Sequence, residues 1–349
     1  MRPIPLNSAK NIAVIRTDHI GDLIVSTPFL YNLRQAAPQA NITAILPRYT
    51  EQVLTHTGLT DHVLAYDGQP DKDFTRSLRE LRADIAICLA PRTIAYKLTR
   101  ATGAPCRVGY YYSNRPLAAV MCRLFYLTHS IGFNIDRELR AGRPIPHEVE
   151  QLGRLAQAMK MPYSDKSLHL TLTNEEQQYA EKLCASWRQP LIVLQLHNNW
   201  LSSDWTVKDL AKLTHSIQQI FSSGDIAICY GPSENLLSKQ LNKELEHDTC
   251  YHFIGDLNFR QWAALFSRAE LVLTPDTGAI HLAAGLHKPV IAVYETRTAK
   301  LNTQQWAPWQ VEHSCIVKDT ADKTIAQIIS RCRSFAQTVA MPDYSIEKQ

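Results

Sequence analysis

The sequence predicts an α/β protein with two Rossmann-like domains, and three observations support this prediction. Apolar segments of strand length alternate with segments of helical periodicity along both halves of the chain, which is the pattern of parallel βαβ units. The 349 residues are enough for two domains that each bury a core. Hydrophobic residues make up 45% of the chain and charged residues 20%, as in soluble globular proteins. We therefore expect two lobes with a cleft between the carboxyl ends of their sheets, where ligands of such folds bind.

In the first half of the chain, apolar runs bounded by turn residues predict strands, and the amphipathic segments between them predict helices. The strands are expected at residues 11–16, 41–46, 62–66, 84–89 and 107–110, and the helices at residues 23–37, 48–57, 73–81 and 93–102.

The second half repeats the same alternation. Its strands are expected at residues 191–196, 225–230, 251–254, 271–273 and 290–294, and its helices at residues 206–222, 233–245, 259–268, 279–286 and 321–340. The last of these helices is long enough to pack back on the N-terminal half.

Between the two halves, residues 140–146 (RAGRPIP) form a basic break rich in Pro and Gly, followed by an expected helix over residues 148–160. The domain boundary is expected within residues 160–185. We therefore expect an N-terminal Rossmann-like domain over residues 1–165 and a C-terminal Rossmann-like domain over residues 166–349.

Charge and cysteine content exclude several classes of function. Lys and Arg number 37 and Asp and Glu number 33, a formal net charge of +4, which is too small to indicate a nucleic-acid partner. The eight cysteines show no C-x-x-C or zinc-ligand spacing, which favours free thiols in a reducing compartment. The N-terminus has no signal-peptide core and no run is long enough to span a membrane, so we expect a cytoplasmic protein.

The loop after the first expected strand, residues 16–22 (RTDHIGD), carries two carboxylates, a histidine and one glycine. It has no G-x-G-x-x-G pattern, which argues against a nicotinamide dinucleotide site there. As an N-cap of the next helix, Asp22 would have a purely structural role, but that interpretation leaves Asp18 unexplained. A carboxylate aimed into a cleft can deprotonate an acceptor hydroxyl, so Asp22 is the candidate general base.

A second informative segment, residues 274–290, delivers Thr277 and Gly278 from an apolar strand to the first turn of a helix. The free backbone N–H groups and the positive end of the dipole at a helix start suit a phosphate. Asp276 and His281 flank this position, where they can hold the hydroxyls of a sugar. An ordinary strand-to-helix turn with Asp276 as the N-cap is the alternative.

At three segments the chain resembles glycosyltransferase family 9, the lipopolysaccharide heptosyltransferases. These segments are residues 16–34 (RTDHIGDLIVSTPFLYNLR), 275–290 (PDTGAIHLAAGLHKPV) and 306–309 (WAPW). The two longer motifs in this order are far more specific than either alone, and the resemblance spans both lobes. It implies a GT-B fold, with a nucleotide-sugar donor on the C-terminal lobe and an acceptor on the N-terminal lobe. It also implies inversion at the anomeric carbon with no metal and no cofactor.

The resemblance assigns roles to individual residues. Asp22 falls on the catalytic base, and Asp276 falls on the carboxylate that holds the donor sugar. Residues 277–279 fall on the backbone that binds the donor phosphates, Glu234 on the acid that reaches the ribose, and Leu257 on the apolar contact of the adenine. The expected donor-binding residues are Asp276, Thr277, Gly278, Ala279, His281, Glu234, Leu257 and Asn199.

One segment, residues 196–205 (LHNNWLSSDW), departs from the family pattern. The family shows a Lys or Arg one or two residues before the tryptophan, where this chain has Ser203 and Asp204 before Trp205. An Asp beside a pyrophosphate is repulsive, so either the donor is held differently or another cation serves. The candidates for that cation are Lys208, Arg297 and Lys300.

The expected acceptor site lies on the N-terminal lobe at Asp18, His19 and Arg92. An Arg at the carboxyl end of a strand suits an anionic acceptor because its fork binds carboxylate and phosphate bidentately, although a single Arg is more often solvated surface. Residues 117–126 (LAAVMCRLFY) are predicted to form a packed helix. The alternative is an interfacial surface that receives a lipid-linked acceptor.

We therefore expect an inverting glycosyltransferase that moves a heptose from ADP-heptose to the inner core of lipopolysaccharide, on a Kdo- or heptose-bearing lipid A acceptor. Its expected partners are the nucleotide-sugar donor, a lipid-linked anionic saccharide and the inner face of the inner membrane, with no nucleic acid. The alternatives are a GT-B transferase that uses another nucleotide sugar and a non-catalytic GT-B-like binding protein. No metal site is expected, because the D-x-D spacing at residues 71–73 is typical of a helix cap.

Overall fold

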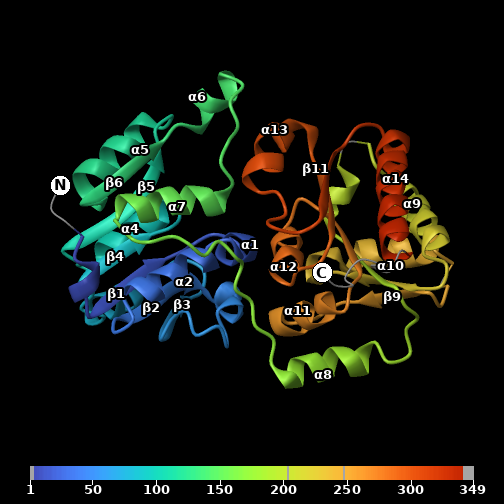
Figure 1. Ribbon diagram of the computed structural model, residues 1–349, viewed down its shortest axis with the longest axis horizontal. Coiled ribbons are helices and arrows are strands. Elements are labelled where there is room, and N and C mark those ends of the chain that lie inside the picture. Colours follow the sequence, from blue (N-terminus) through green and yellow to red (C-terminus); the bar gives the residue numbers. More distant parts are fainter. Residues whose placement is uncertain (1–3, 203, 247, 341–349) are drawn as a thin grey trace, which may run out of the picture. The chain divides into compact units, whose positions relative to one another are not determined.

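The chain folds around two parallel β-sheets of six strands each in the computed structural model (Figure 1). The structure describes residues 4–202, 204–246 and 248–340. The described chain divides into two units, of which the first contains the residues up to Thr171 together with Gln304–Trp306. The second unit contains the remaining described residues. Two parallel sheets with their helices confirm the expected α/β class.

The strands of the first sheet are β1 (Asn11–Ile15), β2 (Asn41–Pro47), β3 (His62–Tyr66), β4 (Ile85–Cys88), β5 (Cys106–Tyr112) and β6 (His129–Phe133). They lie in the order β3-β2-β1-β4-β5-β6, and all neighbours are parallel. The central strand β1 pairs on both sides, so that Ile12 lies opposite Ile42 and Ile85. The inner strands β1, β2 and β4 are buried and read as continuous apolar runs, which is why the sequence locates them well.

The first unit also contains helices and shorter helical turns. These are α1 (Ile20–Ile24), α2 (Thr27–Ala36), α3 (Lys72–Glu80), α4 (Thr93–Ala101), α5 (Pro116–Met121), α6 (Ile135–Arg140) and α7 (Glu148–Ala158), the 3₁₀ turns η1 (Leu6–Ser8) and η2 (Arg48–Val53), and the π-helical turn η3 (Cys122–Tyr126). Asp71 caps α3 by accepting a hydrogen bond of 2.7 Å from the backbone N–H of Phe74. The helix-cap interpretation of residues 71–73 is therefore confirmed.

The second sheet is built in the same way. Its strands are β7 (Leu191–Gln195), β8 (Asp225–Cys229), β9 (Tyr251–Ile254), β10 (Leu271–Pro275), β11 (Val290–Tyr294) and β12 (His313–Val317), which lie in the order β12-β11-β10-β7-β8-β9. Its helices are α8 (Asn174–Leu183), α9 (Val207–Ile220), α10 (Asn235–Glu244), α11 (Phe259–Ser267), α12 (Ala279–Gly285), α13 (Thr296–Gln305) and α14 (Ala321–Ala340), with the 3₁₀ turns η4 (Asn198–Leu201) and η5 (Pro232–Glu234).

Each sheet has one topological switch point. In the first sheet, the strand order reverses between the neighbours β1 and β4: β2 and β3 follow on one side, and β5 and β6 on the other. In the second sheet it reverses between β7 and β10. In open α/β sheets, ligands bind at the carboxyl ends of the strands that flank this point. We therefore expect ligand-binding residues in the loops that follow β1 and β4 in the first sheet, and β7 and β10 in the second.

Several elements differ from the sequence prediction. The helix expected over residues 23–37 is two helices, α1 and α2, because Pro28 lies at the start of α2 and lacks the N–H that a continuous helix needs. The segment over residues 48–57 forms the 3₁₀ turn η2. The elements β6, β12, α6, α8 and α13 were not predicted.

The last helix, α14, packs against α9 and β12 of the second unit. Its expected packing on the first unit stays a prediction. In the part of the chain that the structure describes, no helix combines the length and the apolar character needed to cross a lipid bilayer.

Candidate active site

In the first unit, a single buried arginine organises the loop that follows β1. Arg16 is 2% exposed, and its Nη1 donates a hydrogen bond to the carbonyl of Leu89 at the end of β4. Its Nη1 also lies 3.3 Å from Glu148 Oε1, and its Nη2 lies 3.2 Å from Asp22 Oδ1 and 3.8 Å from Asp18 Oδ2. Three carboxylates thus converge on one guanidinium. Burial lowers the pKa of Arg16, but the surrounding Asp18, Tyr110, Asp22 and Glu148 together raise it well above its ordinary value, so Arg16 stays charged.

Glu148 is the deepest carboxylate of this cluster. It is the first residue of α7 and is 1% exposed. Its Oε1 accepts a hydrogen bond of 2.8 Å from the Tyr110 hydroxyl, and its Oε2 accepts bonds of 2.7 Å from Gln151 and 3.0 Å from Gln305. With Arg16, Glu148 therefore receives four donors, as a buried carboxylate requires.

Asp22 is held by two contacts and still reaches solvent. Its Oδ2 accepts a hydrogen bond of 2.9 Å from the backbone N–H of His19, and its Oδ1 faces Arg16. The side chain is 16% exposed. Because a carboxylate offers about four lone-pair sites, Asp22 keeps acceptor capacity for a hydroxyl proton while its orientation is fixed.

The residues expected at the acceptor site gather around the same loop. Asp18 Oδ2 lies 3.9 Å from Nε of Arg92, whose side chain is about half exposed. The hydroxyl of Tyr49 donates a bond of 2.8 Å to the carbonyl of Asp18 and lies 3.5 Å from His19 Nδ1. Burial raises the pKa of Asp18, Arg16 opposes that shift, and Asp22 adds to it. The structure thus brings Asp18, His19 and Arg92 together with Asp22 in the first unit.

In the second unit, Asp276 follows β10 and is fixed by two asparagines. Its Oδ2 accepts a hydrogen bond of 2.6 Å from Asn302 of α13, and its backbone carbonyl accepts one of 3.3 Å from Asn199. Burial raises the pKa of Asp276, and the hydrogen bond from Asn302 opposes that shift. The N-cap of α12 is Gly278, so the interpretation of Asp276 as a helix cap is wrong.

The expected phosphate-binding segment forms a tight turn into α12. The hydroxyl of Thr277 accepts a hydrogen bond of 3.3 Å from the backbone N–H of Ala279 and lies 3.0 Å from the hydroxyl of Thr274. Gly278 has a φ of −57°, which any residue can adopt, so backbone freedom does not require a glycine here. His281 is only 5% exposed, which favours a packing role and leaves its contact with the donor a prediction.

The remaining expected donor residues lie at the same edge of the second sheet. Glu234 follows β8 and is 4% exposed; its Oε1 accepts a hydrogen bond of 3.1 Å from Asn198, and its Oε2 accepts one of 2.7 Å from Ser233. Leu257 follows β9 and is half-buried. Since β7, β8 and β9 are neighbours, the loops that carry Asn199, Glu234 and Leu257 share one edge of the sheet.

A lysine that the sequence analysis did not consider, Lys318, supports this edge. Its ammonium is buried directly after β12 and donates to the carbonyl of Asn199, to that of Trp200 (3.1 Å) and to the hydroxyl of Ser202 (2.8 Å). It also pairs with Glu295 at 2.8 Å. Burial lowers the pKa of Lys318, and the contact with Glu295 opposes that shift.

Lys318 therefore holds the turn η4 in the segment where the family cation was expected. Its three N–H groups are occupied by protein acceptors, so it positions this turn rather than offering a free charge to a ligand. Asp204 is exposed, as are the three candidate cations, and Ser203 lies outside the described residues. The candidate cations are Lys208, Arg297 and Lys300.

Sequence reasoning missed Glu148, Asn302 and Lys318 as parts of these sites. A Glu in the first turn of a helix is normally a solvated partner of the helix dipole, and nothing local marks Glu148 as buried. One signal was present: Arg16 and Lys318 each come directly after a strand and are followed at once or after one residue by an Asp. A charged residue directly after a strand lies at the carboxyl edge of its sheet.

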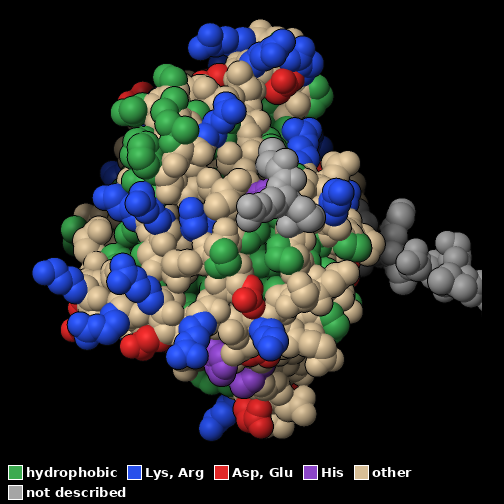
Figure 2. All heavy atoms as spheres, turned by 90° about the vertical axis from the view of Figure 1, so that its left-hand side faces the viewer, with side chains coloured by type: hydrophobic (Ala, Val, Ile, Leu, Met, Phe, Trp, Pro, Cys, Tyr) green, Lys and Arg blue, Asp and Glu red, His purple; other side chains and the backbone are tan. Residues whose placement is uncertain are grey.

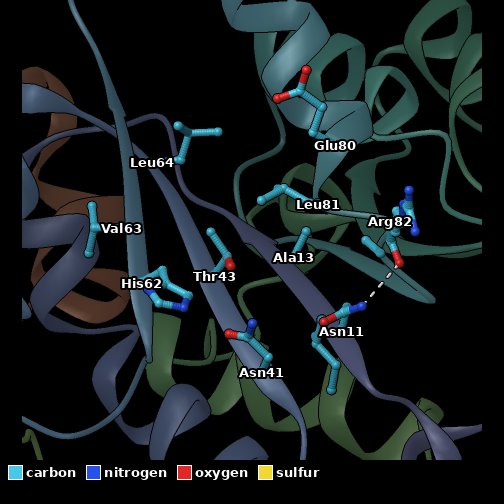
Figure 3. A pocket seen from close by; sticks show the side chains of 12 residues that line it. Asn11, Ala13, Asn41, Thr43, His62, Val63, Leu64, Glu80, Leu81 and Arg82 are labelled. Carbon is cyan, nitrogen blue, oxygen red and sulfur yellow. Dashed lines mark hydrogen bonds between the residues drawn. The ribbon is translucent and has the colours of Figure 1, made fainter.

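A hollow of about 390 Å³ lies at the other end of the first sheet, beside the first residues of β1, β2 and β3 (Figure 3). Figure 3 shows Asn41, Thr43 and His62 on neighbouring strands and the 3.5 Å hydrogen bond from Asn11 to the carbonyl of Arg82. Since ligands of such sheets bind at the carboxyl ends, this hollow carries no functional assignment. Among the residues that the structure describes, no group of three His, Cys, Asp or Glu side chains is arranged to hold a metal ion.

Replacing Asp18 with Asn should change how the free energy of unfolding depends on pH. Because the pKa of Asp18 is raised in the folded protein, the folded state binds more protons at this carboxyl than the unfolded chain above about pH 4. Wild-type protein should therefore lose stability relative to Asp18→Asn as the pH rises from about 4 through the raised pKa. Urea titrations at both ends of this window measure the difference. A difference that stays constant, or that changes in the opposite direction, contradicts the assignment.

Replacing Lys318 with Met should destabilise the second unit. The variant leaves Glu295 and the carbonyls of η4 without their buried donor, a change that typically costs about 3 kcal/mol. Lys323→Met is the matched control, because Lys323 is an exposed lysine on α14 with an ion pair to Asp319. Urea unfolding compares the two variants. Equal stability of Lys318→Met and the control would show that Lys318 does not order this edge.

Comparisons with known proteins agree with this architecture. The family model described as "Glycosyltransferase family 9 (heptosyltransferase)" matches residues 72–330, which is more than half of the chain. The chain is 21% identical over 309 residues to "Lipopolysaccharide core heptosyltransferase OpsX" of Haemophilus influenzae, covering 86% of this chain and 84% of that relative.

Two solved structures share the fold. "Structure of E. coli ADP-heptose lps heptosyltransferase II" has a TM-score of 0.75 and 18% identity, with 95% of this chain and 100% of that chain covered. "E. coli heptosyltransferase WaaC with ADP" has a TM-score of 0.66 and 15% identity, with 94% and 99% covered. These similarities confirm the expected GT-B fold class. The chain is a glycosyltransferase and belongs to glycosyltransferase family 9, the family that residues 16–34 and 275–290 led us to expect.

Proposed function

We propose that this glycosyltransferase moves a heptose from ADP-heptose to the inner core of lipopolysaccharide, with inversion and without a metal ion, at the cytoplasmic face of the inner membrane. The observation that supports this most is the cluster around Arg16, which presents an oriented, partly exposed carboxylate at the switch point of the first sheet. Relatives described as lipopolysaccharide heptosyltransferases support the choice of sugar and acceptor.

The reaction assigned to this cluster is a direct displacement. Asp22 takes the proton of the acceptor hydroxyl as its oxygen attacks the anomeric carbon of the donor. The bond from that carbon to the diphosphate oxygen breaks, the nucleoside diphosphate leaves with the electron pair, and the configuration inverts. Arg16 keeps Asp22 in orientation, and His19 donates its backbone N–H to the other carboxylate oxygen. An oriented general base is worth about 10²–10⁴-fold in rate.

The donor is assigned to the second unit. Asp276, held by Asn302 and Asn199, accepts hydrogen bonds from the sugar hydroxyls. The backbone of residues 277–279 binds the diphosphate, Glu234 binds the ribose and Leu257 contacts the adenine. A structure titled "E. coli heptosyltransferase WaaC with ADP-2-deoxy-2-fluoro heptose" supports an ADP-sugar for a protein of this fold.

The charge of the leaving diphosphate must be met without a metal under this proposal. Backbone N–H groups at the start of α12 supply part of the stabilisation, and one of Lys208, Arg297 or Lys300 supplies the cation.

A second candidate function follows from the segment over residues 196–205, which departs from the family pattern. The exposed Asp204, where the family pattern led us to expect a cation, favours a donor whose phosphates are held differently, as in a transferase that uses another nucleotide sugar.

The acceptor is assigned to the first unit. Arg92 is half exposed and projects its guanidinium beside Asp18, where it can bind a carboxylate or phosphate of an anionic saccharide. Asp18 and His19 lie on the same loop as Asp22 and complete the acceptor site. We propose a lipid-linked anionic saccharide as the acceptor.

Replacing Asp22 with Asn tests the proposed base. The variant keeps the shape of the side chain and removes its basicity, so kcat should fall about 10²–10⁴-fold with little change in donor affinity. Transfer from ADP-heptose to a Kdo-bearing lipid A acceptor is measured in excess EDTA, with Asp73→Asn, an exposed carboxylate on α3, as the control. If the turnover of Asp22→Asn stays within about threefold of wild type, Asp22 is not the general base. Wild-type activity that is lost in EDTA and restored by Mg²⁺ would overturn the metal-free mechanism.

Replacing Gly278 with Val tests the proposed phosphate site. The branched side chain fills space against the backbone N–H groups, so affinity for ADP should fall by at least about tenfold, the scale of one lost charge-assisted hydrogen bond. Gly278→Ala is the matched control, because Ala adopts the observed φ of −57° with one added carbon. Calorimetry with ADP, UDP and GDP measures both affinity and choice of base. Unchanged ADP affinity for Gly278→Val would place the phosphates elsewhere, and tighter UDP binding by wild-type protein would favour the second candidate function.

A further inference from the structure

An exposed apolar ridge lies on the first unit. Its members lie on α5 and η3 and are Leu117, Val120, Leu124 and Phe125, with exposed fractions of 77%, 50%, 70% and 48%. Eight large hydrophobic side chains are exposed in the described residues, and half of them form this nine-residue ridge. Such a concentration marks an interaction surface.

Internal packing does not explain the ridge, because the opposite face of the same segment does the packing. Cys122 is fully buried in the core of the first unit, and Ala119 and Tyr126 pack against that core. The ring of Tyr126 stacks on that of Tyr96 at 6.0 Å. The segment therefore has apolar side chains on both sides, and within the described part of the chain the outer ones stay exposed.

The segment of the chain that contains the ridge is basic. Residues 85–135 contain no Asp or Glu and six Lys or Arg residues. Four of these cations are exposed on the ridge segment or on α4, which packs against η3: Lys97, Arg100, Arg115 and Arg123. Figure 2 shows hydrophobic side chains gathered on this face of the molecule with Lys and Arg side chains beside them.

We propose that this surface docks on an anionic lipid bilayer. The ridge side chains enter the boundary between headgroups and acyl chains, and the flanking Lys and Arg side chains face the lipid phosphates. Apolar side chains bordered by basic ones are the combination that binds peripheral proteins to anionic membranes. A second copy of the chain fits this surface poorly, because two such faces would bring cations against cations.

The position of the ridge agrees with a lipid-linked acceptor, and in this respect the inference rests on the proposed function. The helix α4 begins directly after Arg92, the proposed acceptor residue, and packs against η3. One substructure of the first unit thus carries both the ridge and the acceptor-side arginine. Membrane binding would hold the enzyme where its acceptor lies.

Vesicle binding by the full chain tests this inference without donor or acceptor. Wild-type protein should sediment with vesicles of phosphatidylglycerol and phosphatidylethanolamine, and much less with phosphatidylcholine vesicles or at high salt. The double variant L124Q/F125Q should lose at least about tenfold in partitioning, and R115Q/R123Q should lose the preference for anionic lipid. L236Q is the matched control, because Leu236 is a 70% exposed leucine on α10 of the second unit.

Separate outcomes distinguish the possible failures. Circular dichroism checks that each variant is folded, and L117Q, a change at the most exposed ridge residue, replaces the double variant if that protein is not. The inference is overturned if wild-type protein does not sediment with anionic vesicles. It is also overturned if L124Q/F125Q binds these vesicles as well as L236Q does. Self-association that L124Q/F125Q abolishes, without vesicle binding, assigns the ridge to a second copy instead. Vesicle binding that persists when no heptose transfer is found would leave the inference standing and the proposed function refuted.

Discussion

The burial of one guanidinium constrains the loops of the first unit to which we assign catalysis. Arg16 has almost no exposed surface, so its charge must be met by protein groups, and an unpaired charge there would be strongly destabilising. Two of the required partners come from distant parts of the chain, since Leu89 follows β4 and Glu148 begins α7, while Asp22 lies nearby in α1. The contacts that neutralise Arg16 fix the relative positions of β1, β4, α1 and α7. They also orient the carboxylate of Asp22 at the edge of the sheet.

In the second unit, the buried Lys318 has a role similar to that of Arg16. In both units a buried cation follows a strand directly and binds the carbonyls or carboxylates of neighbouring loops. The cations order these loops, and Asp22, on the loop that Arg16 holds, stays partly exposed. This division explains why Lys318 cannot simply take the place of the family cation beside Trp205: all of its donors serve the fold.

The sequence was sufficient where structure follows from local pattern and insufficient where it depends on distant contacts. Continuous apolar runs located β1 and β10, and the polar residues after them located Asp22 and Asp276. The edge strand β12 was missed because it is largely exposed, so it lacks the buried apolar run of a central strand. Glu148 and Asn302 were missed because their roles depend on partners more than 20 residues away in sequence, at Arg16 and Asp276.

A double-mutant cycle between Glu148→Gln and Asp22→Asn tests most directly whether the buried network around Arg16 controls the base. Glu148 and Asp22 each contact Arg16, so Glu148 should act on turnover through the orientation of Asp22. We predict that Glu148→Gln lowers kcat in wild-type protein, has little further effect in Asp22→Asn, and gives a coupling free energy of about 1–3 kcal/mol. Additive losses in kcat, with a coupling below about 0.5 kcal/mol, would contradict the control of Asp22 by this network.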